Sequence, residues 1–508
     1  MITVSDAWKS VHKETILPES FVELTYGITE PGAQDFLEES NNGAMFYSDH
    51  EAIVETVDKD FHKYATLENN IWVLDGSMEL LPDDEPYGDT GYVSSEKYLP
   101  TITLTLPSVR THPIPGLTIV FSETYEEYAA RISLTALNGT EIIAEQEFEN
   151  NSVRNTFDFP MSGYDTIYVD IDEWIVPDHR ARIERIYLGH IEIYTNGSLV
   201  NYSHTQTADL LSTALPKNEI KFSLDNSTDM WNPDSPSAMV SYLMDRQEIS
   251  VRYGFKLPAG VEWINAGTFW LNSWDTPSNG LEATFTARDL LEFMDVTYTG
   301  PRSGTLYTIA EAALIQSNLP TAANGSPRYY IDESLKDITT DFTEDDSVYE
   351  TAVIIQMVAN AGQCVIRVPR DGTLRIERLV RQLSDYAVDQ SISYTHPERS
   401  MTKPPKDVTI NDGLWVKTIS TSGESITISN PVITTAVNAE HVCNWAATVL
   451  SRRNILKGGY RPDPRLDALD IISIESKYSN NFVAAVTDIS YQYNGAFRGE
   501  YTAREIEV

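Results

Sequence analysis

Apolar and polar residues alternate along residues 217–291, and this pattern predicts a series of strands. In EISVRYGF, the apolar residues Ile249, Val251, Tyr253 and Phe255 fall on one face, with polar residues between them. FVELTYGI, far upstream, follows the same rule, as does ATFTARD. Alternation with a period of two is typical of half-buried strands. Four or five such strands, separated by short polar turns, predict a small antiparallel barrel or a strongly curled sheet.

Residues 99–200 carry a second series of short strands at regular intervals. The candidates are TITLTL, GLTIVF, ARISLTAL, EIIAEQEF, YDTIYVDI and RARIERIYLGHIEIY. Asn138-Gly139 predicts a tight turn between two of them. Short alternating strands at even spacing favour a β-sandwich. Because the sandwich separates FVELTYGI from the other barrel strands, we expect an insertion whose ends, near Val93 and Tyr202, lie close together.

Residues 300–395 change to helical spacing. Capping boxes begin at Thr308 and at Ser347, and each predicts a helix, the second with the better apolar stripe. The run CVIRVPRDGTLRIERL that follows predicts two strands around a turn at Arg370-Asp371-Gly372. This part of the chain is expected to form a compact α+β unit.

Residues 396–508 form a second β-rich unit with one helix. Its strand candidates are KDVTI, LWVKTI, SITIS, DIISIES and FVAAVTDISYQY, and Asn438 is expected to cap the helix. We therefore predict a mainly β protein with a minor α+β part. The expected division is 1–30 (N-terminal arm and first strand of barrel 1), 31–98 (acidic connection), 99–200 (inserted β-sandwich), 201–299 (rest of barrel 1), 300–395 (α+β unit) and 396–508 (barrel 2).

The chain is strongly acidic, and this restricts its partners. Among 508 residues, 75 are acidic and 37 basic, for a formal net charge of −38. Such a surface repels phosphate backbones, so ordinary nucleic-acid binding is disfavoured. It suits the wall of a conduit through which a polyanion slides without sticking, although solubility explains it equally well.

No targeting or membrane segment is recognisable. The N-terminus lacks a basic region followed by an apolar run, and no apolar stretch approaches the roughly 20 residues of a membrane helix. Cys364 and Cys443 lie in apolar contexts and are predicted to be buried thiols. We expect synthesis and folding in a reducing cytoplasm, with no membrane anchor.

The sequence contains no recognisable catalytic constellation. It lacks a glycine-rich phosphate loop, a GxSxG elbow, an HExxH motif and a CxxC pair. His441 and Cys443 are two residues apart on a predicted helix and point to different faces. The acidic run DDEPYGD matches no EF-hand and is interpreted as a solvated loop, with calcium as the alternative. We therefore predict that the chain is not an enzyme and needs no cofactor or metal.

Trp263, Trp270 and Trp274 are a second group of candidate functional residues. A tryptophan cluster is one form of sugar platform. In alternating strands, however, Trp270 and Trp274 share a face, which favours packing against a neighbouring domain or subunit. We predict that these three residues are subunit-interface aromatics.

The strands of residues 99–200 resemble a known module. GLTIVF, the hairpin ARISLTALNGTEI, YDTIYVDI and W..P...RARIERIYLG together are similar to the galactose-binding-like jelly roll, a common carbohydrate-binding module. The resemblance implies that Trp174, Arg180 and Arg182 are the residues to contact a glycan. Their positions in or beside a strand favour structural packing over glycan contact.

A second resemblance covers residues 201–508 and the first strand. It is carried by F.LDN...MWNP with E.SVRYG, by EW...GTFWL..W, by LEATFTARDLL, and by YTIAEAAL with VIIQMVANAGQCVIRVPRDGTLRI. NPVIT....A..V..WAA..L, D.RLDALDIISIE and Y.YNGAF.GEYTAREI continue it. In this order the patterns resemble the baseplate hub proteins of phage tails and related contractile machines.

The hub resemblance implies an architecture and a set of partners. In that family, two tail-tube-like barrels lie side by side in each chain, and three chains form a ring that continues the tube into the tip. Expected partners are a homotrimer, tail-tube or distal-tail ring proteins, and a spike, tip or tape-measure protein. DNA would only pass through the lumen, and a host cell-wall glycan would be the ligand of the inserted module. The expected location is the virion tail, after assembly in the host cytoplasm.

Two alternatives stay open at this level. One is a six-fold distal-tail adapter ring, which also combines a tube-like domain with a galactose-binding-like module but does not need a second barrel. The other is a carbohydrate-active enzyme with an attached binding module, which the lack of a signal peptide disfavours. Ring symmetry separates the first from a hub, and turnover of purified cell wall would reveal the second.

Overall fold

The fold is taken from a computed structural model of the 508-residue chain. The residues that the structure describes are 2–12, 14, 19–28, 38–41, 46–47, 65–67, 101–111, 113–121, 126–176, 181–227, 229, 231–232, 246–258, 260–275, 280–320, 327–384, 386–478 and 481–507. Strands dominate them, so the expected mainly β fold with a minor helical part is confirmed.

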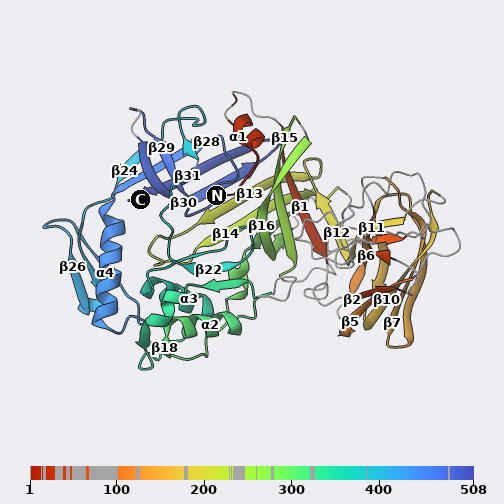
Figure 1. Ribbon diagram of the computed structural model, residues 1–508, viewed down its shortest axis with the longest axis horizontal. Coiled ribbons are helices and arrows are strands. Elements are labelled where there is room, and N and C mark those ends of the chain that lie inside the picture. Colours follow the sequence, from red (N-terminus) through yellow and green to blue (C-terminus); the bar gives the residue numbers. More distant parts are fainter. Residues whose placement is uncertain are drawn as a thin grey trace.

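One sheet of 13 strands organises the molecule (Figure 1). Its neighbouring strands, in order, are β12 (His190–Tyr194), β1 (Ser20–Ile28), β15 (Glu248–Leu257), β16 (Gly260–Asp275), β17 (Glu282–Arg288), β14 (Lys217–Asp225), β13 (Leu199–Thr207), β30 (Asn481–Tyr493), β31 (Phe497–Glu505), β28 (Asn454–Tyr460) and β24 (Glu398–Met401). Two more strands, β29 (Ile471–Glu475) and β23 (Ala387–Val388), extend it from β30. Strands from both ends of the chain therefore belong to a single sheet.

The alternating pattern explains how this sheet buries one face. Ile249, Val251, Tyr253 and Phe255 are all buried in one hydrophobic core, as their alternation predicts. That core also contains Tyr491 and other residues of the C-terminal strands. The antiparallel pairing of β13 with β30 joins the strands from β12 to β13 to those from β30 to β24, with β29 and β23. We refer to these two sets as the strand groups. They consequently share one apolar interior.

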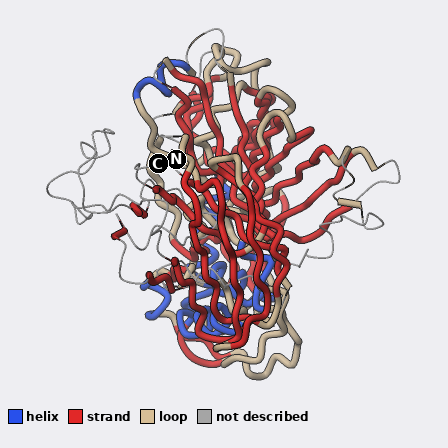
Figure 2. The backbone as a smooth tube through the Cα atoms, turned by 90° about the vertical axis from the view of Figure 1, so that its right-hand side faces the viewer, coloured by secondary structure: helices blue, strands red, loops and turns tan. Residues whose placement is uncertain are grey.

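The N-terminal helix α1 (Asp6–Val11), at the top in Figure 2, packs on this core through Trp8. Trp8 is fully buried and meets the Phe255 ring edge to face at 4.8 Å. Its indole N–H donates to Asp463 at 3.2 Å. Because Phe255 and Asp463 belong to the two different strand groups, this single side chain contacts both.

The chain leaves the large sheet at Ile28 and returns to it at His190. These two residues lie opposite each other in the antiparallel ladder of β1 and β12. The expected exit, Val93, lies outside the described residues, and the return comes earlier than the expected Tyr202. RARIERIYLGHIEIY, expected as one strand, is two strands divided at Gly189, whose φ of 123° favours glycine.

All ten strands between these two points form a separate sandwich of two five-stranded sheets, at one end of the molecule (Figure 1). One sheet is β2 (Glu38–Asn41), β5 (Thr101–Arg110), β10 (Tyr164–Trp174), β7 (Ala129–Asn138) and β8 (Glu141–Glu149). The other is β3 (Phe46–Tyr47), β4 (Ala65–Leu67), β11 (Ala181–Leu188), β6 (Ile114–Phe121) and β9 (Arg154–Met161). Apolar residues of both sheets form one core.

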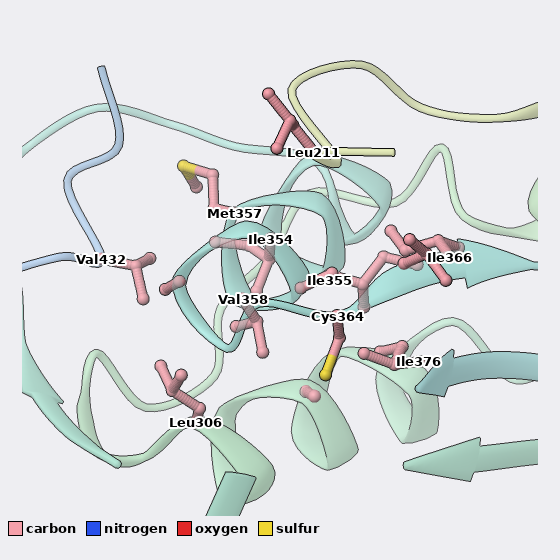
Figure 3. Close-up of a cluster of buried hydrophobic side chains, with 14 of the residues drawn as sticks. Leu211, Leu306, Ile354, Ile355, Met357, Val358, Cys364, Ile366, Ile376 and Val432 are labelled. Atoms are coloured by element: carbon pink, nitrogen blue, oxygen red, sulfur yellow. The ribbon is translucent and has the colours of Figure 1, made fainter. Parts of the chain in front are cut away.

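The α+β unit packs against the opposite face of the large sheet from the shared core. Its elements are η5 (Leu290–Phe293), β18 (Ser303–Thr305), α2 (Leu306–Gln316), β19 (Tyr329–Ile331), η6 (Glu333–Asp337), β20 (Thr339–Asp341), α3 (Thr351–Ala361), β21 (Val365–Arg367) and β22 (Leu374–Glu377). Figure 3 shows the core between its helices and strands, which includes Ile354, Val358 and Ile376. Cys364 lies in this core, and Cys443 is also a buried free thiol, as predicted.

Each of the predicted helices begins at a different residue from the one expected. Thr305, rather than Thr308, caps α2 and accepts from the Thr308 N–H. Glu350 is the N-cap of α3 and makes no side-chain cap bond. The helix expected at Asn438 is α4 (Ala436–Ser451), capped by Thr435. A hydroxyl or amide three residues from the true cap produced each shifted prediction.

Three strands expected in the second barrel form a small sheet of their own. They are β25 (Pro405–Ile410), β26 (Trp415–Thr418) and β27 (Glu424–Ile428), and the short helix η7 (Asn411–Gly413) follows β25. They pack with α4 into the same core as the α+β unit. Alternation identified them as strands, but it carries no information about which sheet a strand joins.

Candidate functional site

The turn between β21 and β22 reaches the line where the two strand groups meet. Arg370, at this turn, is only 6% exposed. Its Nε donates to Asp467 Oδ1 at 2.8 Å, and its two terminal nitrogens donate to the carbonyl oxygens of Asn265 and Leu466 at 3.1 and 3.2 Å. The guanidinium also lies over the Tyr253 ring, 5.7 Å from its centre. One side chain of the α+β unit thus contacts both strand groups.

Charge pairing allows Arg370 to be buried. Burial alone would lower the pKa of Arg370, but Asp467, Tyr491 and Tyr253 together outweigh that effect and the pKa is raised. The guanidinium therefore stays charged. A buried ion pair is sustained only when its remaining donors are also satisfied, and the two carbonyl bonds do this here.

His204 extends the same buried network inside the large sheet. Its Nδ1 lies 2.8 Å from the Tyr253 hydroxyl and its Nε2 lies 2.7 Å from Asn218 Oδ1. An amide oxygen only accepts, so Nε2 carries the proton and Nδ1 accepts from Tyr253. Burial lowers the pKa of His204 to about 4, and the Arg370 charge acts in the same direction, against the Asn218 bond and Asp467. His204 is therefore neutral at neutral pH.

Gln206 completes the connection to the loop before β29. Its Nε2 donates to Asp467 Oδ1 at 3.1 Å, and its Oε1 accepts from the Ala468 N–H at 2.9 Å. The network joins β13, β15, the β21–β22 turn and this loop through bonds that use the polar atoms of each side chain. Such an arrangement holds segments in position, and burial raises the pKa of the Tyr253 hydroxyl that faces the histidine. We refer to His204, Gln206, Tyr253, Arg370 and Asp467 as the joint network.

The joint network predicts a loss of stability in acid. The pKa of His204 is about 4 in the folded chain, below its ordinary value of 6.5, so the unfolded chain binds more protons between these pH values. The free energy of unfolding should therefore fall as the pH is lowered from 6.5 to 4, by on the order of 3 kcal/mol. Urea unfolding across this range measures it.

A His204→Gln variant is the control, because glutamine does not titrate. The pKa of Asp289 is raised to about 7, mainly by burial, and its contribution has the opposite sign over the same range. The difference between wild type and variant removes this shared contribution. Parallel stability curves for the two proteins would contradict the assignment.

The candidate glycan residues do not form an exposed group in the described structure. Trp174 is 5% exposed, meets Phe121 edge to face at 5.6 Å and donates to Glu127 at 3.2 Å. Trp174 is thus part of the sandwich core, and its ring has no free face for a sugar. Arg180 lies outside the described residues, as does the side chain of Arg182, whose backbone lies in β11.

The three candidate interface tryptophans occupy different environments. Trp263 is half-buried, contacts the Phe21 ring at 6.0 Å and lies beneath the Arg252 guanidinium. Trp270 is 2% exposed and packs on Phe293 of the α+β unit. Trp274 packs against the shared core of the large sheet.

The expectation that Trp270 and Trp274 share a face is wrong. In β16, Trp270 lies in the core of the α+β unit, whereas Leu271 and Trp274 belong to the shared core. The register of β16 with β17 shifts between Leu271 and Ser273. This bulge inserts one residue and moves Trp274 to the opposite face.

Neither metal nor membrane features appear in the part of the chain that the structure describes. The acidic run expected as a solvated loop (Asp83, Asp84, Glu85 and Asp89) lies outside the described residues. Within those residues, no three histidine, cysteine or acidic side chains are grouped to hold a metal ion. No described helix has the length and apolar character needed to cross a membrane.

The sequence patterns missed the joint network because its members are distant in the chain. Arg370 was visible only as the first residue of a turn, and Asp467 as one acid of D.RLDALDIISIE. Asp463 and Arg465 of that pattern form a second buried pair, with Arg465 Nε donating to Asp463 at 2.7 Å. The signal available in the sequence was a cluster of charged residues beside apolar ones, just before the buried strand β29.

Comparison with known sequences gave no matching family model and no matching curated protein. Comparison with solved structures found several similar chains. The 43 kDa tail protein of prophage MuSo2 from Shewanella oneidensis has a TM-score of 0.43 and 11% sequence identity, over 61% of this chain and 94% of that chain. A tail protein from Neisseria meningitidis has a TM-score of 0.42 and 12% identity, over 62% of this chain and 94% of that chain.

A third similar structure comes from a secretion system. It is an E. coli protein described as a component of the type VI secretion system, with a TM-score of 0.36 and 8% identity, over 61% of this chain and 74% of that chain. The solved structures to which this chain is similar are thus phage tail proteins and related secretion-system proteins. All three TM-scores are below 0.5.

Proposed function

We propose that this protein is a structural component of a phage-type tail, a hub that continues the tail tube toward the tip or spike as a trimeric ring. The observation that carries the proposal is the single 13-stranded sheet that joins two strand groups around a shared core. Two barrel-like groups in one chain allow three chains to supply six units. A ring of this kind would match a six-fold tube on one side and a three-fold tip on the other.

Unpaired edges of the large sheet support the ring. Among the described strands, β12 pairs only with β1 and β24 pairs only with β28, so the sheet has an open end at each. All four residues of β24 are exposed. An unpaired edge is a template for another strand, and joining edges between subunits would satisfy its backbone groups.

The joint network supports a rigid connection between the strand groups. Arg370 and Asp467 connect the α+β unit, β16 and the loop before β29 through buried and partly buried bonds. Fixed geometry between the two groups is what a ring of defined curvature requires. The net charge of −38 suits a lumen through which DNA passes without binding. Tube or distal-ring subunits, and a spike or tape-measure protein, are the partners that this role implies.

The inserted sandwich would project from such a ring. It begins and ends at the edge strand pair β1–β12, away from β13 and β30. A glycan-binding role for it would require residues other than the buried Trp174. We therefore propose the sandwich as an external module of the hub, with Trp174 as a core residue rather than a ligand contact.

A proline at the exposed edge tests the ring. The Thr402 N–H donates toward β28, to the Arg453 carbonyl, so the N–H of the preceding Met401 points away from β28. Met401→Pro removes that outward donor and leaves the β24–β28 ladder intact. We expect it to abolish the ring in size-exclusion chromatography with light scattering while the chain stays folded.

Met401→Ala is the matched control, because it removes the same exposed side chain and keeps the backbone donor. It should assemble like wild type. Equal assembly of both variants would show that the β24 edge is not a subunit contact. Circular dichroism separates loss of assembly from loss of folding.

A further inference from the structure

A cavity of about 240 Å³ lies beside the joint network, where several parts of the chain meet. Its walls are Ile2, the ends of β13 and β14, Asp289 after β17, the turn between β21 and β22, and the loop before β29. The wall carries aliphatic side chains, among them Ala208, Pro216 and Val368, and charged ones. The cavity therefore combines an apolar surface with buried charge.

Each cation on the wall is already engaged with a carboxylate. Lys217 lies 3.1 Å from Glu219, which also pairs with Lys221 and Arg288, and Arg367 Nε donates to Glu377 at 2.6 Å. Arg370 is paired with Asp467, as described above. Each of these three cations therefore already has a partner within the protein.

Asp289 is the wall residue whose charge is not compensated in this way. It is 2% exposed, and one of its carboxylate oxygens accepts from the Leu291 N–H at 3.0 Å at the start of η5. Its other oxygen has no donor among the described residues. The neighbouring Arg288 is engaged with Glu219 at 3.2 Å and with Glu292 at 3.5 Å. A buried carboxylate without a counterion is costly, so it either takes up a proton or receives a cation.

We propose that this cavity binds a primary alkylammonium group, with Asp289 as its counterion and the aliphatic wall against its alkyl chain. A bare metal ion fits poorly, because the described residues offer no group of three ligating side chains and the volume greatly exceeds one ion. A neutral polar molecule would leave the Asp289 charge uncompensated. An aliphatic amine supplies the missing charge and fills the apolar part.

Two sources present this chemistry: a free aliphatic diamine, or a lysine side chain of a partner chain. Both place an ammonium group at the end of a short methylene chain. A bound amine would connect η5, the β21–β22 turn and the loop before β29, because all three border the cavity. Binding of an amine in the cavity should therefore also stabilise the joint network.

Isothermal titration calorimetry of the full chain at pH 8 tests the site. The probes are 1,4-diaminobutane, Nα-acetyl-lysine methylamide and 1,4-butanediol, the last being a neutral molecule of matched length. We expect saturable binding of at least one amine and none of the diol. The diamine alone binding would identify a free amine as the ligand, and the lysine derivative alone would identify a partner's side chain.

Asp289→Asn is the matched variant, since asparagine is an equally good N-cap and keeps the acceptor for Leu291. It should weaken amine binding at least tenfold, which corresponds to about 1.4 kcal/mol for a lost charge-assisted bond. In wild type, binding should also weaken from pH 8 to pH 5.5 as the Asp289 carboxylate takes up a proton. No saturable binding, equal binding of the diol, or amine binding unchanged in the variant or at pH 5.5 would overturn the proposal.

Discussion

Replacing Arg370 with alanine is expected to lower the free energy of unfolding of the large sheet by about 3–5 kcal/mol, the cost of breaking a buried ion pair. The change removes the bond to Asp467 and the bonds to the Asn265 and Leu466 carbonyls. It leaves the Asp467 carboxylate, which is 18% exposed, without its partner. Urea unfolding followed by circular dichroism measures the loss.

Two further variants separate charge from shape and position. Arg370→Lys keeps the charge but lacks the planar fork that reaches three acceptors, so an intermediate loss is expected. The second variant is Arg375→Ala. Arg375 lies on the same hairpin, and the side chain of its partner Asp371 is 47% exposed. That pair should contribute less than about 1 kcal/mol. Equal losses for Arg370→Ala and Arg375→Ala would show that the turn does not hold the strand groups together.

Replacing residues 29–189 with Asn-Gly is expected to leave the large sheet folded, although it removes the whole sandwich. Ile28 and His190 are direct partners in the β1–β12 ladder. Opposed residues of an antiparallel pair lie within reach of a two-residue turn, and Asn-Gly suits that turn. The midpoint of thermal unfolding of the sheet should stay within about 4 °C of wild type, a shift corresponding to about 1 kcal/mol.

A longer deletion provides the contrast. Removing residues 29–198 also takes away β12, including the buried Tyr194, and leaves β1 as a bare edge. Burial of one such side chain contributes about 2 kcal/mol, so this variant should be less stable by at least that amount. Ring formation should survive the short deletion. If the short deletion destabilised the sheet as much as the long one, the sandwich would not be an insertion.

Local patterns predicted the strands and the apolar faces because both depend on neighbouring residues. Ile249, Val251, Tyr253 and Phe255 are buried together as their spacing requires. The Arg370-Asp371-Gly372 turn was also foreseen, and its glycine has a φ of 69°. These features follow from side-chain alternation and from backbone preferences that a single segment displays.

Features that depend on distant contacts were not predictable. The bulge after Leu271 moved Trp274 to the opposite face, and no residue type announces it. The assignment of β25 to a separate sheet depends on packing with α4. The joint network was missed for the same reason, because Tyr253, Arg370 and Asp467 meet only after three parts of the chain have folded together. Periodicity identifies a buried strand but not its partner.

The mass and symmetry of the purified full chain test the hub proposal most directly. Native mass spectrometry and electron-microscopic class averages should give a closed ring of three copies of the 57.0 kDa chain, 171 kDa in total, with three-fold symmetry. The Met401→Pro variant should give single chains under the same conditions. A wild-type protein that stays monomeric at micromolar concentration, or that forms six-fold rings, would contradict the proposal.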